Sequence, residues 1–262
     1  MKTPRSGPYE PGYAFAKSIV IPFVRRWFRV HLEGEEHIPA SGPAIVAVNH
    51  ISYMDPLAVA YAIHINGRRP RFLGKAGLFR YPLIGWVLKG AKQIPVERGT
   101  RSAPQSLEHA EEALQAGEVL VIFPEGTTTT SPNLEPLRPK SGIARLALKT
   151  GLPVIPCATW GGQWFWTKHL GVKPMPGKDL WVRFGPPIYF KEYQGREEDR
   201  EAFAEISEKI MDEIAILLAG LKAAKPWKTT YPTRKRFIKQ GANATRFERS
   251  KDQAERDETD DG

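Results

Sequence analysis

The sequence predicts an α/β fold: a single-domain sandwich in which helices flank a central mixed β-sheet. Three observations predict it. Apolar segments typical of strands alternate with helical segments, several strand segments are apolar throughout, and glycines follow two of the helices. At 262 residues, the chain can bury one sizeable core. We expect an N-terminal segment over residues 1–32, one domain over 33–221 and a charged tail over 222–262.

The N-terminal segment is apolar from residue 13 to 32, with clustered arginines. In a helix, Arg25, Arg26 and Arg29 would lie opposite an apolar face made of Ile19, Val20, Phe23, Val24, Trp27 and Val30. Such amphipathic helices are typical of proteins that dock on an anionic membrane surface. The alternative is an ordinary helix packed on the domain. Pro22 is expected to kink the segment or to start a second helix.

Strands and helices alternate along the middle of the chain. Apolar runs predict strands over 44–50, 70–75, 92–98, 118–126, 152–160 and 179–190. Helices are expected between them and after them, over 53–63, 76–90, 103–116, 141–150 and 197–221. Gly117 and Gly151 are candidate C-caps, and Pro82 lies inside the second predicted helix. The last helix carries apolar residues at helical spacing and is expected to pack on the core.

The charge and composition limit the classes of function. A net charge of +9 and an isoelectric point near 9.6 indicate an anionic partner: nucleic acid, a lipid surface or a phosphorylated substrate. A single cysteine, Cys157, excludes an internal disulfide, and the scattered histidines predict no zinc site. We find neither a secretory signal nor an apolar run of 18 residues, so we expect a soluble protein or one that lies on a membrane. The polar composition of about the last 30 residues predicts disorder.

The stretch NHISYMDP follows the first strand of the predicted domain. In one continuous helix His50 and Asp55 would point apart, because five positions rotate by about 500°. If His50 ends a strand and Asp55 lies in the first turn of the next helix, the loop between them can bring the two side chains together. Ser52 would cap that helix, and Pro56 is tolerated early in it.

The chemistry of this pair fits general-base catalysis. An imidazole can take a proton from an alcohol at neutral pH, and a carboxylate on its other nitrogen would fix the tautomer and stabilise the imidazolium. The sequence has no nucleophile elbow, and Cys157 lies in an apolar strand. The pair would therefore activate a substrate hydroxyl directly. The alternative is that His50 and Asp55 only cap a strand and a helix.

Two other strand ends carry polar residues. In FPEGTTTT, Glu125 has no packing reason to follow an apolar strand, and Gly126 permits a tight turn with free backbone amides. In KQIPVERG, the guanidinium of Arg98 would bind a phosphate in a bidentate manner. Each residue alone would be an exposed charge. Together with the strand end that carries His50 and Asp55, however, the three strand ends predict one cleft.

Taken in order, these motifs resemble those of the 1-acylglycerol-3-phosphate acyltransferase family of phospholipid synthesis. The similarity runs over residues 13–190 and includes five segments: NHISYMDP, GKAGLF with Lys75, KQIPVER with Arg98, FPEGT, and LPVIPCATWG. The ordered set is highly specific, although no single member is.

The resemblance implies a glycerol-3-phosphate acyltransferase-like fold and a defined reaction. The family moves a fatty acyl group from acyl-CoA, or acyl carrier protein, to the free hydroxyl of lysophosphatidic acid, which gives phosphatidic acid. By this resemblance His50 is the general base, Asp55 orients it and no acyl-enzyme forms. Arg98, with Lys75 in support, would hold the substrate phosphate. The glycerol moiety would be positioned by Glu125, Gly126 and Thr127.

The same resemblance implies the remaining features of the enzyme. It implies no metal and no cofactor, with acyl-CoA as the donor substrate, and no nucleic-acid partner. Pro156 would shape the wall for the acyl chain, and amides near the Glu-Gly turn would stabilise the oxyanion. The protein would lie on the cytoplasmic face of an anionic membrane, as a peripheral or monotopic protein docked through residues 13–32. The oligomeric state is left open.

One departure from the family concerns the acceptor. The family's third motif usually continues with Arg and Ser, whereas Thr128 and Thr129 follow here, so Lys140 is a candidate for the missing phosphate contact. The first alternative is a related acyltransferase with another acceptor, such as glycerol 3-phosphate, a different lysophospholipid or a glycolipid. The others are a hydrolase that activates water and a non-catalytic lipid- or nucleic-acid-binding module.

Overall fold

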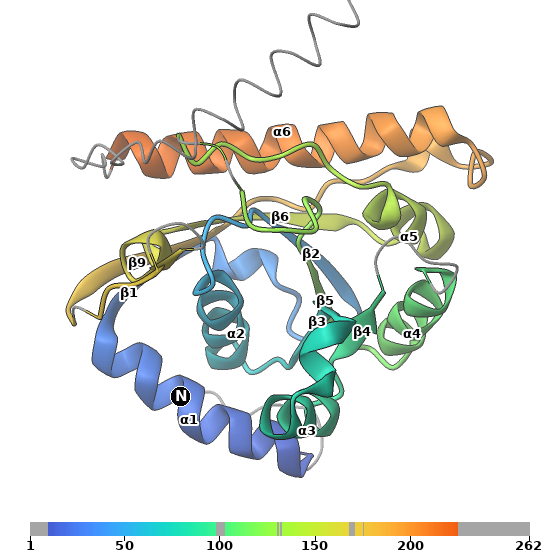
Figure 1. Cartoon of the computed structure of the whole chain (residues 1–262). Coiled ribbons are helices and arrows are strands. Elements are labelled where there is room, and N and C mark those ends of the chain that lie inside the picture. The colour runs from blue at the N-terminus through green and yellow to red at the C-terminus, as the bar shows by residue number, and fades with distance from the viewer. Residues whose placement is uncertain are drawn as a thin grey trace, which may run out of the picture. The chain divides into compact units, whose positions relative to one another are not determined.

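A computed structural model describes residues 10–97, 103–129, 131, 133–167, 171–174 and 176–224 of the chain. Its centre is a seven-stranded sheet in the order β1-β9-β6-β2-β5-β3-β4 (Figure 1). The strands are β1 (Phe28–Glu33), β2 (Ala44–Val48), β3 (Pro70–Lys75), β4 (Ile94–Val96), β5 (Val119–Ile122), β6 (Val154–Trp160) and β9 (Lys178–Phe184). Neighbouring strands are parallel except for β6 and β9, so the predicted mixed sheet is confirmed.

Helices cover both faces of this sheet (Figure 1). One face is covered by α1 (Pro11–Trp27) and α2 (Asp55–Ile65), and the other by α4 (Ala103–Gln115), α5 (Gly142–Thr150) and α6 (Arg200–Ala224). The side chains of β2 alternate between the two cores, with Val46 and Val48 in the first and Ile45 and Ala47 in the second. Burial on both faces explains why the central strands are apolar throughout.

The region predicted as one helix over 76–90 is divided in two. A 3-10 helix, η2 (Ala76–Arg80), is followed by α3 (Pro82–Gly90), and Pro82 begins the second helix because its missing N–H costs nothing there. Smaller elements complete the described fold: the 3-10 helices η1 (Glu35–His37), η3 (Gly162–Trp164) and η4 (Lys191–Tyr193), and a hairpin of β7 (Trp166–Thr167) with β8 (Gly171–Val172).

The predicted N-terminal helix was wrong beyond Trp27. Residues 28–33 form β1, which pairs in parallel with β9, and the sequence FRVHLE shows the alternation of apolar and polar residues that such a strand requires. Arg29 and His31 both reach Asp179 on β9, at 2.9 Å each. Pro22 does not start a second helix, since α1 runs continuously through it.

The apolar face expected to enter a membrane is instead packed on the domain. Val24 is fully buried in the core, and Val20, Phe23, Trp27 and Val30 pack against it. Only Ile19 of the predicted face is exposed. The alternative of an ordinary packed helix is therefore the correct one for this face, because the apolar side chains of α1 cover the edge of the first core.

Several other boundaries differ by a few residues. The predicted strands over 44–50, 92–98 and 118–126 end at Val48, Val96 and Ile122, and the last helix extends to Ala224. From residue 225 onward, the tail predicted to be disordered lies outside the described residues. Among the helices that the structure describes, none has the length and apolar character needed to cross a bilayer.

Candidate active site

The junction between β2 and α2 brings His50 and Asp55 together. β2 ends at Val48, α2 begins at Asp55, and the loop between them returns His50 toward the start of the helix. His50 Nδ1 lies 3.0 Å from Asp55 Oδ2. The imidazole is 15% exposed, whereas the carboxylate is completely buried. The predicted hydrogen bond across a strand–loop–helix junction is therefore present.

Asp55 is held in place by the backbone of its own loop. Its Oδ2 accepts hydrogen bonds from the amides of Ile51 and Ser52, at 2.7 Å each, and its Oδ1 accepts one from Ser52 Oγ at 2.5 Å. A buried carboxylate with this many donors keeps one orientation. The predicted N-cap was misplaced by two residues: Met54 is the N-cap, and Ser52 Oγ accepts a hydrogen bond from its amide at 3.2 Å.

Two residues that sequence reasoning missed, Asn49 and Gly162, fix the loop itself. Asn49 Oδ1 accepts a hydrogen bond from the Thr159 amide at 2.7 Å, which ties the loop to the end of β6. Gly162 packs directly beneath Ser52, because a methyl group built on it would lie 2.4 Å from Ser52 Oγ. The signal for Asn49 was a polar residue at the end of an apolar strand. The contact of Gly162 has no signal in the sequence.

The second nitrogen of the imidazole has no hydrogen-bond partner among the residues that the structure describes. With Nδ1 directed at Asp55, a proton on Nδ1 would be donated to the carboxylate, and Nε2 would be left with a free lone pair. The ring of Phe123 lies against His50 with its centroid at 4.4 Å, which restricts rotation of the imidazole. This arrangement suits a base that accepts a proton at Nε2.

Glu125 follows β5 and contacts the main chain of His50. Its Oε1 accepts a hydrogen bond from the His50 amide at 2.7 Å, and its Oε2 accepts one from the Leu137 amide at 2.8 Å. The residue is 3% exposed. Burial raises the pKa of its carboxyl to about 7, although the two amides act in the opposite direction. The predicted glycerol contact stays a prediction, but both oxygens already have main-chain partners.

The threonines after Glu125 differ in their surroundings. Thr127 is exposed, whereas Thr128 and Thr129 are buried. The Thr129 amide donates to the His50 carbonyl at 2.7 Å, so this segment binds both main-chain polar groups of His50. Gly126 has φ +69°, as its predicted turn requires, but its amide already donates to Phe123 O and is not free. One expected donor for an oxyanion is therefore occupied.

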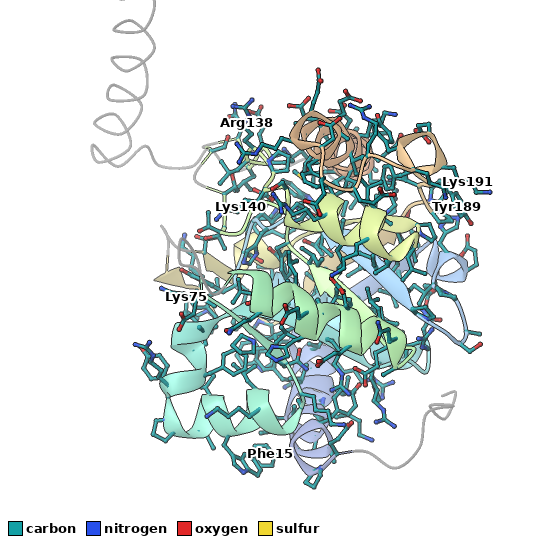
Figure 2. All side chains as sticks on the ribbon, turned by 90° about the vertical axis from the view of Figure 1, so that its right-hand side faces the viewer. Phe15, Lys75, Arg138, Lys140, Tyr189 and Lys191 are labelled. Atoms are coloured by element: carbon teal, nitrogen blue, oxygen red, sulfur yellow. The ribbon has the colours of Figure 1, made fainter. Side chains whose placement is uncertain are left out.

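Two basic side chains lie at the same side of the molecule. Lys75 ends β3 and is exposed, and Figure 2 shows it below Lys140 on that side. Lys140 lies across Gly126: its Nζ is 3.2 Å from the position that a methyl group on this glycine would occupy. The Lys140 amide donates to Pro124 O at 3.0 Å, which fixes its backbone beside the turn. Arg98, the predicted phosphate ligand, lies outside the described residues.

The described residues offer neither a thiol nucleophile nor a metal site. Cys157 is fully buried, and burial raises the pKa of its thiol, so it cannot supply a reactive thiolate. Within the described ranges, no cluster of three or more His, Cys, Asp or Glu side chains could hold a metal ion.

Comparison with known proteins shows the family to which the chain belongs. A family model described as acyltransferase matches residues 29–160. The 1-acyl-sn-glycerol-3-phosphate acyltransferase BAT2 (chloroplastic) of Brassica napus is 31% identical over 67% of this chain and 48% of its own length. The LPAT1 enzyme (chloroplastic) of the same description from Arabidopsis thaliana is 32% identical over 56% of this chain and 39% of its own length. The chain thus spans less than half of either plant relative.

A solved structure has the same fold. The 1-acyl-sn-glycerophosphate acyltransferase PlsC of Thermotoga maritima superimposes with a TM-score of 0.59 and 26% identity, over 77% of this chain and 75% of that one. The chain therefore belongs to the acyltransferase family, as its ordered motifs predicted. Within that family it resembles the 1-acylglycerol-3-phosphate acyltransferases.

Proposed function

We propose that the protein transfers a fatty acyl group from acyl-CoA to the free hydroxyl of 1-acylglycerol 3-phosphate. The observation that carries the proposal is the His50–Asp55 pair, joined at 3.0 Å through Nδ1, which leaves Nε2 of the imidazole to act as the base. The plant relatives support the choice of acceptor, since their descriptions name that acyltransferase activity.

The geometry supports direct transfer without an acyl-enzyme. Nε2 of His50 takes the proton of the acceptor hydroxyl while the hydroxyl oxygen attacks the thioester carbonyl carbon. The carbon–oxygen bond forms, the tetrahedral oxyanion collapses, and the carbon–sulfur bond breaks. The thiolate of CoA then leaves and takes the proton from the imidazolium. Asp55 stabilises that imidazolium from the opposite side of the ring, and its own position is fixed by Ser52 and the loop amides.

The acceptor phosphate would bind among basic residues next to this pair. Lys140 lies across the Glu125–Gly126 turn and Lys75 ends β3 on the same side of the molecule (Figure 2). Arg98 would complete the set, as the family motif implies. We further propose that the reaction takes place at the cytoplasmic face of a membrane, with the enzyme bound peripherally, because both substrates are amphiphiles.

A related acceptor is the second candidate. The positions after the Glu-Gly turn, which usually carry Arg and Ser in the family, carry Thr128 and Thr129 here, and both are buried. They cannot offer a cation to the acceptor phosphate. An acceptor with a different headgroup would then be used, with the same pair of catalytic residues.

An assay of the purified full-length chain separates these possibilities. Acyl-CoA of several chain lengths would be supplied with lysophosphatidic acid, glycerol 3-phosphate, other lysophospholipids or glycolipids, and products would be identified by mass. We expect the highest kcat/KM with lysophosphatidic acid. No turnover with it, but turnover with another acceptor, would move the assignment to that acceptor. Hydrolysis of acyl-CoA without any acylated lipid would contradict acyl transfer.

A further inference from the structure

α3 and η2 expose their largest apolar side chains to the outside. Leu83 is 67% exposed and Trp86 is 53% exposed, and Leu78, Tyr81 and Ile84 are also exposed. Phe15 of α1 joins them, because its ring meets the ring of Trp86 edge-on at 5.3 Å. We call these six residues the α3 surface. Large side chains that gather on one exposed surface mark an interaction site more often than single exposed ones do.

Packing of the fold does not explain this surface, because α3 turns its glycines toward the protein. A methyl group on Gly85 would lie 2.2 Å from the carbonyl oxygen of Phe79 in η2. At the other end of α3, a methyl group on Gly12 of α1 would lie 2.4 Å from Gly90. The helix is thus attached through its backbone, and Leu83, Ile84 and Trp86 are left on the outer side. A helix that served only the core would have the reverse arrangement.

The charges around the α3 surface indicate what it contacts. Three basic side chains are exposed here: Lys75 at the end of β3, Arg80 on η2 and Lys89 on α3. The sequence carries no acidic residue between 70 and 96, nor within α1. Trp and Tyr beside Leu and Ile, with lysine and arginine around them, are the side chains that enter the headgroup region of an anionic bilayer.

The α3 surface follows directly, along the chain, from the edge of the sheet that carries the candidate active site. η2 begins directly after Lys75 at the carboxyl end of β3, and the carboxyl ends of the parallel strands β2, β3 and β5 lie at one edge of the sheet. His50 and Glu125 follow two of those ends. In Figure 1, α3 and α1 lie together on the side of the molecule opposite α6.

We propose that the α3 surface, rather than the Trp/Phe/Val face of α1, inserts into an anionic lipid bilayer. This rests on the proposed function only in that the acceptor is then a lipid of the same bilayer. The leucine, isoleucine and aromatic side chains enter the headgroup boundary, while Arg80 and Lys89 bind lipid phosphates. The catalytic edge of the sheet is thereby brought to the level at which the hydroxyl of a lysolipid lies.

A paired substitution of Leu83→Asp and Ile84→Asp tests the surface in the full-length chain. Both positions lie in the first turn of α3, where an aspartate favours the helix dipole, so the fold is expected to persist. The matched control is Ile216→Asp on α6, which is 63% exposed. Binding would be measured by sedimentation with vesicles of equimolar phosphatidylglycerol and phosphatidylcholine, and with phosphatidylcholine alone. Thermal melting of each variant checks the fold.

We expect wild type to bind the anionic vesicles more tightly than the neutral ones. The paired variant should bind them at least about tenfold more weakly, and the control should match wild type. Wild-type binding by the paired variant, or equal binding to both vesicle types by wild type, would overturn the proposal. A dimer that dissociates on the substitution, with vesicle binding unchanged, would assign the surface to a second protein chain instead.

Activity assays separate this proposal from the proposed function. With a short-chain acceptor that stays monomeric in solution, the paired variant should keep the wild-type rate, and with an acceptor embedded in vesicles it should lose activity. Vesicle binding through the α3 surface by a chain that transfers no acyl group would leave the docking surface standing and refute the reaction. Equal rates for wild type and variant on embedded acceptor would refute the docking surface alone.

Discussion

Glu125 and His50 are joined through the main chain of the histidine rather than through its ring. Glu125 Oε1 accepts a hydrogen bond from the His50 amide at 2.7 Å, and the Thr129 amide, four residues later, donates to the His50 carbonyl at 2.7 Å. Asp55 holds the ring of the same residue at 3.0 Å. The proposed base is therefore fixed at its backbone by one motif and at its side chain by another.

Replacement of His50 by alanine tests the proposed base. We expect kcat to fall at least about 100-fold, because removal of general-base catalysis typically has an effect of this size. Acyl-CoA binding should change little, and thermal melting shows whether the variant keeps its fold, because the imidazole is largely buried beside Phe123. The control is His31→Ala, a histidine on β1 that pairs with Asp179 away from this loop. Wild-type turnover by the His50 variant would refute the mechanism.

Replacement of Asp55 by asparagine should lower both activity and stability. The amide group keeps one acceptor, but its N–H faces either the donor amides of Ile51 and Ser52 or the Ser52 hydroxyl, whose O–H then loses its acceptor. Leaving buried donors unpaired costs about 1–3 kcal/mol. The expected result is a lower melting temperature together with a loss of kcat, and loss of kcat alone would contradict the structural part of this role.

The state of Glu125 should make activity depend on pH near neutrality. Burial raises the pKa of Glu125 from 4.5 to about 7, so the carboxyl takes up a proton as the pH falls through 7. The protonated group can no longer accept from the amides of both His50 and Leu137. Glu125→Gln, which also accepts only one of them, should resemble the protonated form at every pH. The ratio of wild-type to variant kcat should therefore fall as the pH is lowered through 7.

Glu125 should make the stability of the fold change with pH in the direction opposite to the change in kcat. Because the pKa is higher in the folded chain than in the unfolded one, the contribution of Glu125 to the free energy of unfolding is complete below pH 4.5 and is lost as the pH rises toward 7. Denaturant unfolding across this window should show a decline for wild type relative to Glu125→Gln. A parallel pH dependence of the two proteins would show that Glu125 titrates normally.

Gly162 offers a test of the support beneath the site. A methyl group there would lie 2.4 Å from Ser52 Oγ and 2.9 Å from Met54 Cβ. Gly162→Ala should displace Ser52 from Asp55, which would cost about 1–3 kcal/mol of stability and lower kcat about tenfold or more. The matched control is Gly142→Ala on α5, where no atom lies within 4 Å of the added methyl. Equal kcat for the two alanine variants would contradict the role.

Lys140 is expected to contribute to acceptor binding. Lys140→Ala should raise KM for lysophosphatidic acid by about tenfold while KM for acyl-CoA stays near the wild-type value, since a lost charged hydrogen bond has about this effect. Lys191→Ala is the control, because Lys191 is exposed on the opposite side of the molecule (Figure 2). A larger effect on the acyl-CoA KM would place Lys140 at the donor site.

Much of this fold was predictable because its strands are buried on both faces. The continuous apolar runs that became β2, β5 and β6 are typical of such strands, and the paired His50 and Asp55 follow from the end of one strand and the start of the next helix. Local patterns of this kind depend on the segment itself. They can therefore be recognised without knowledge of the tertiary contacts.

The errors arose where a partner distant in sequence decides the outcome. Residues 28–33 extend an apolar helical pattern, but pairing with β9, about 150 residues later in the chain, turns them into a strand. The apolar face of α1 was assigned to a membrane because its packing partners are not neighbours in the sequence. For the same reason, the amides that occupy the carboxylate of Glu125, and the glycine beneath Ser52, could not be foreseen.

The direct passage from α1 into β1 affects how the amino-terminal region can be studied. Removal of residues 1–32 would take away nearly all of the strand that borders β9, and with it Val24 from the interior. An unpaired sheet edge invites aggregation. A shortened protein that no longer sediments with lipid, or that precipitates, would report damage to the architecture rather than the absence of an anchor. Point changes on the outer helical surfaces avoid that ambiguity.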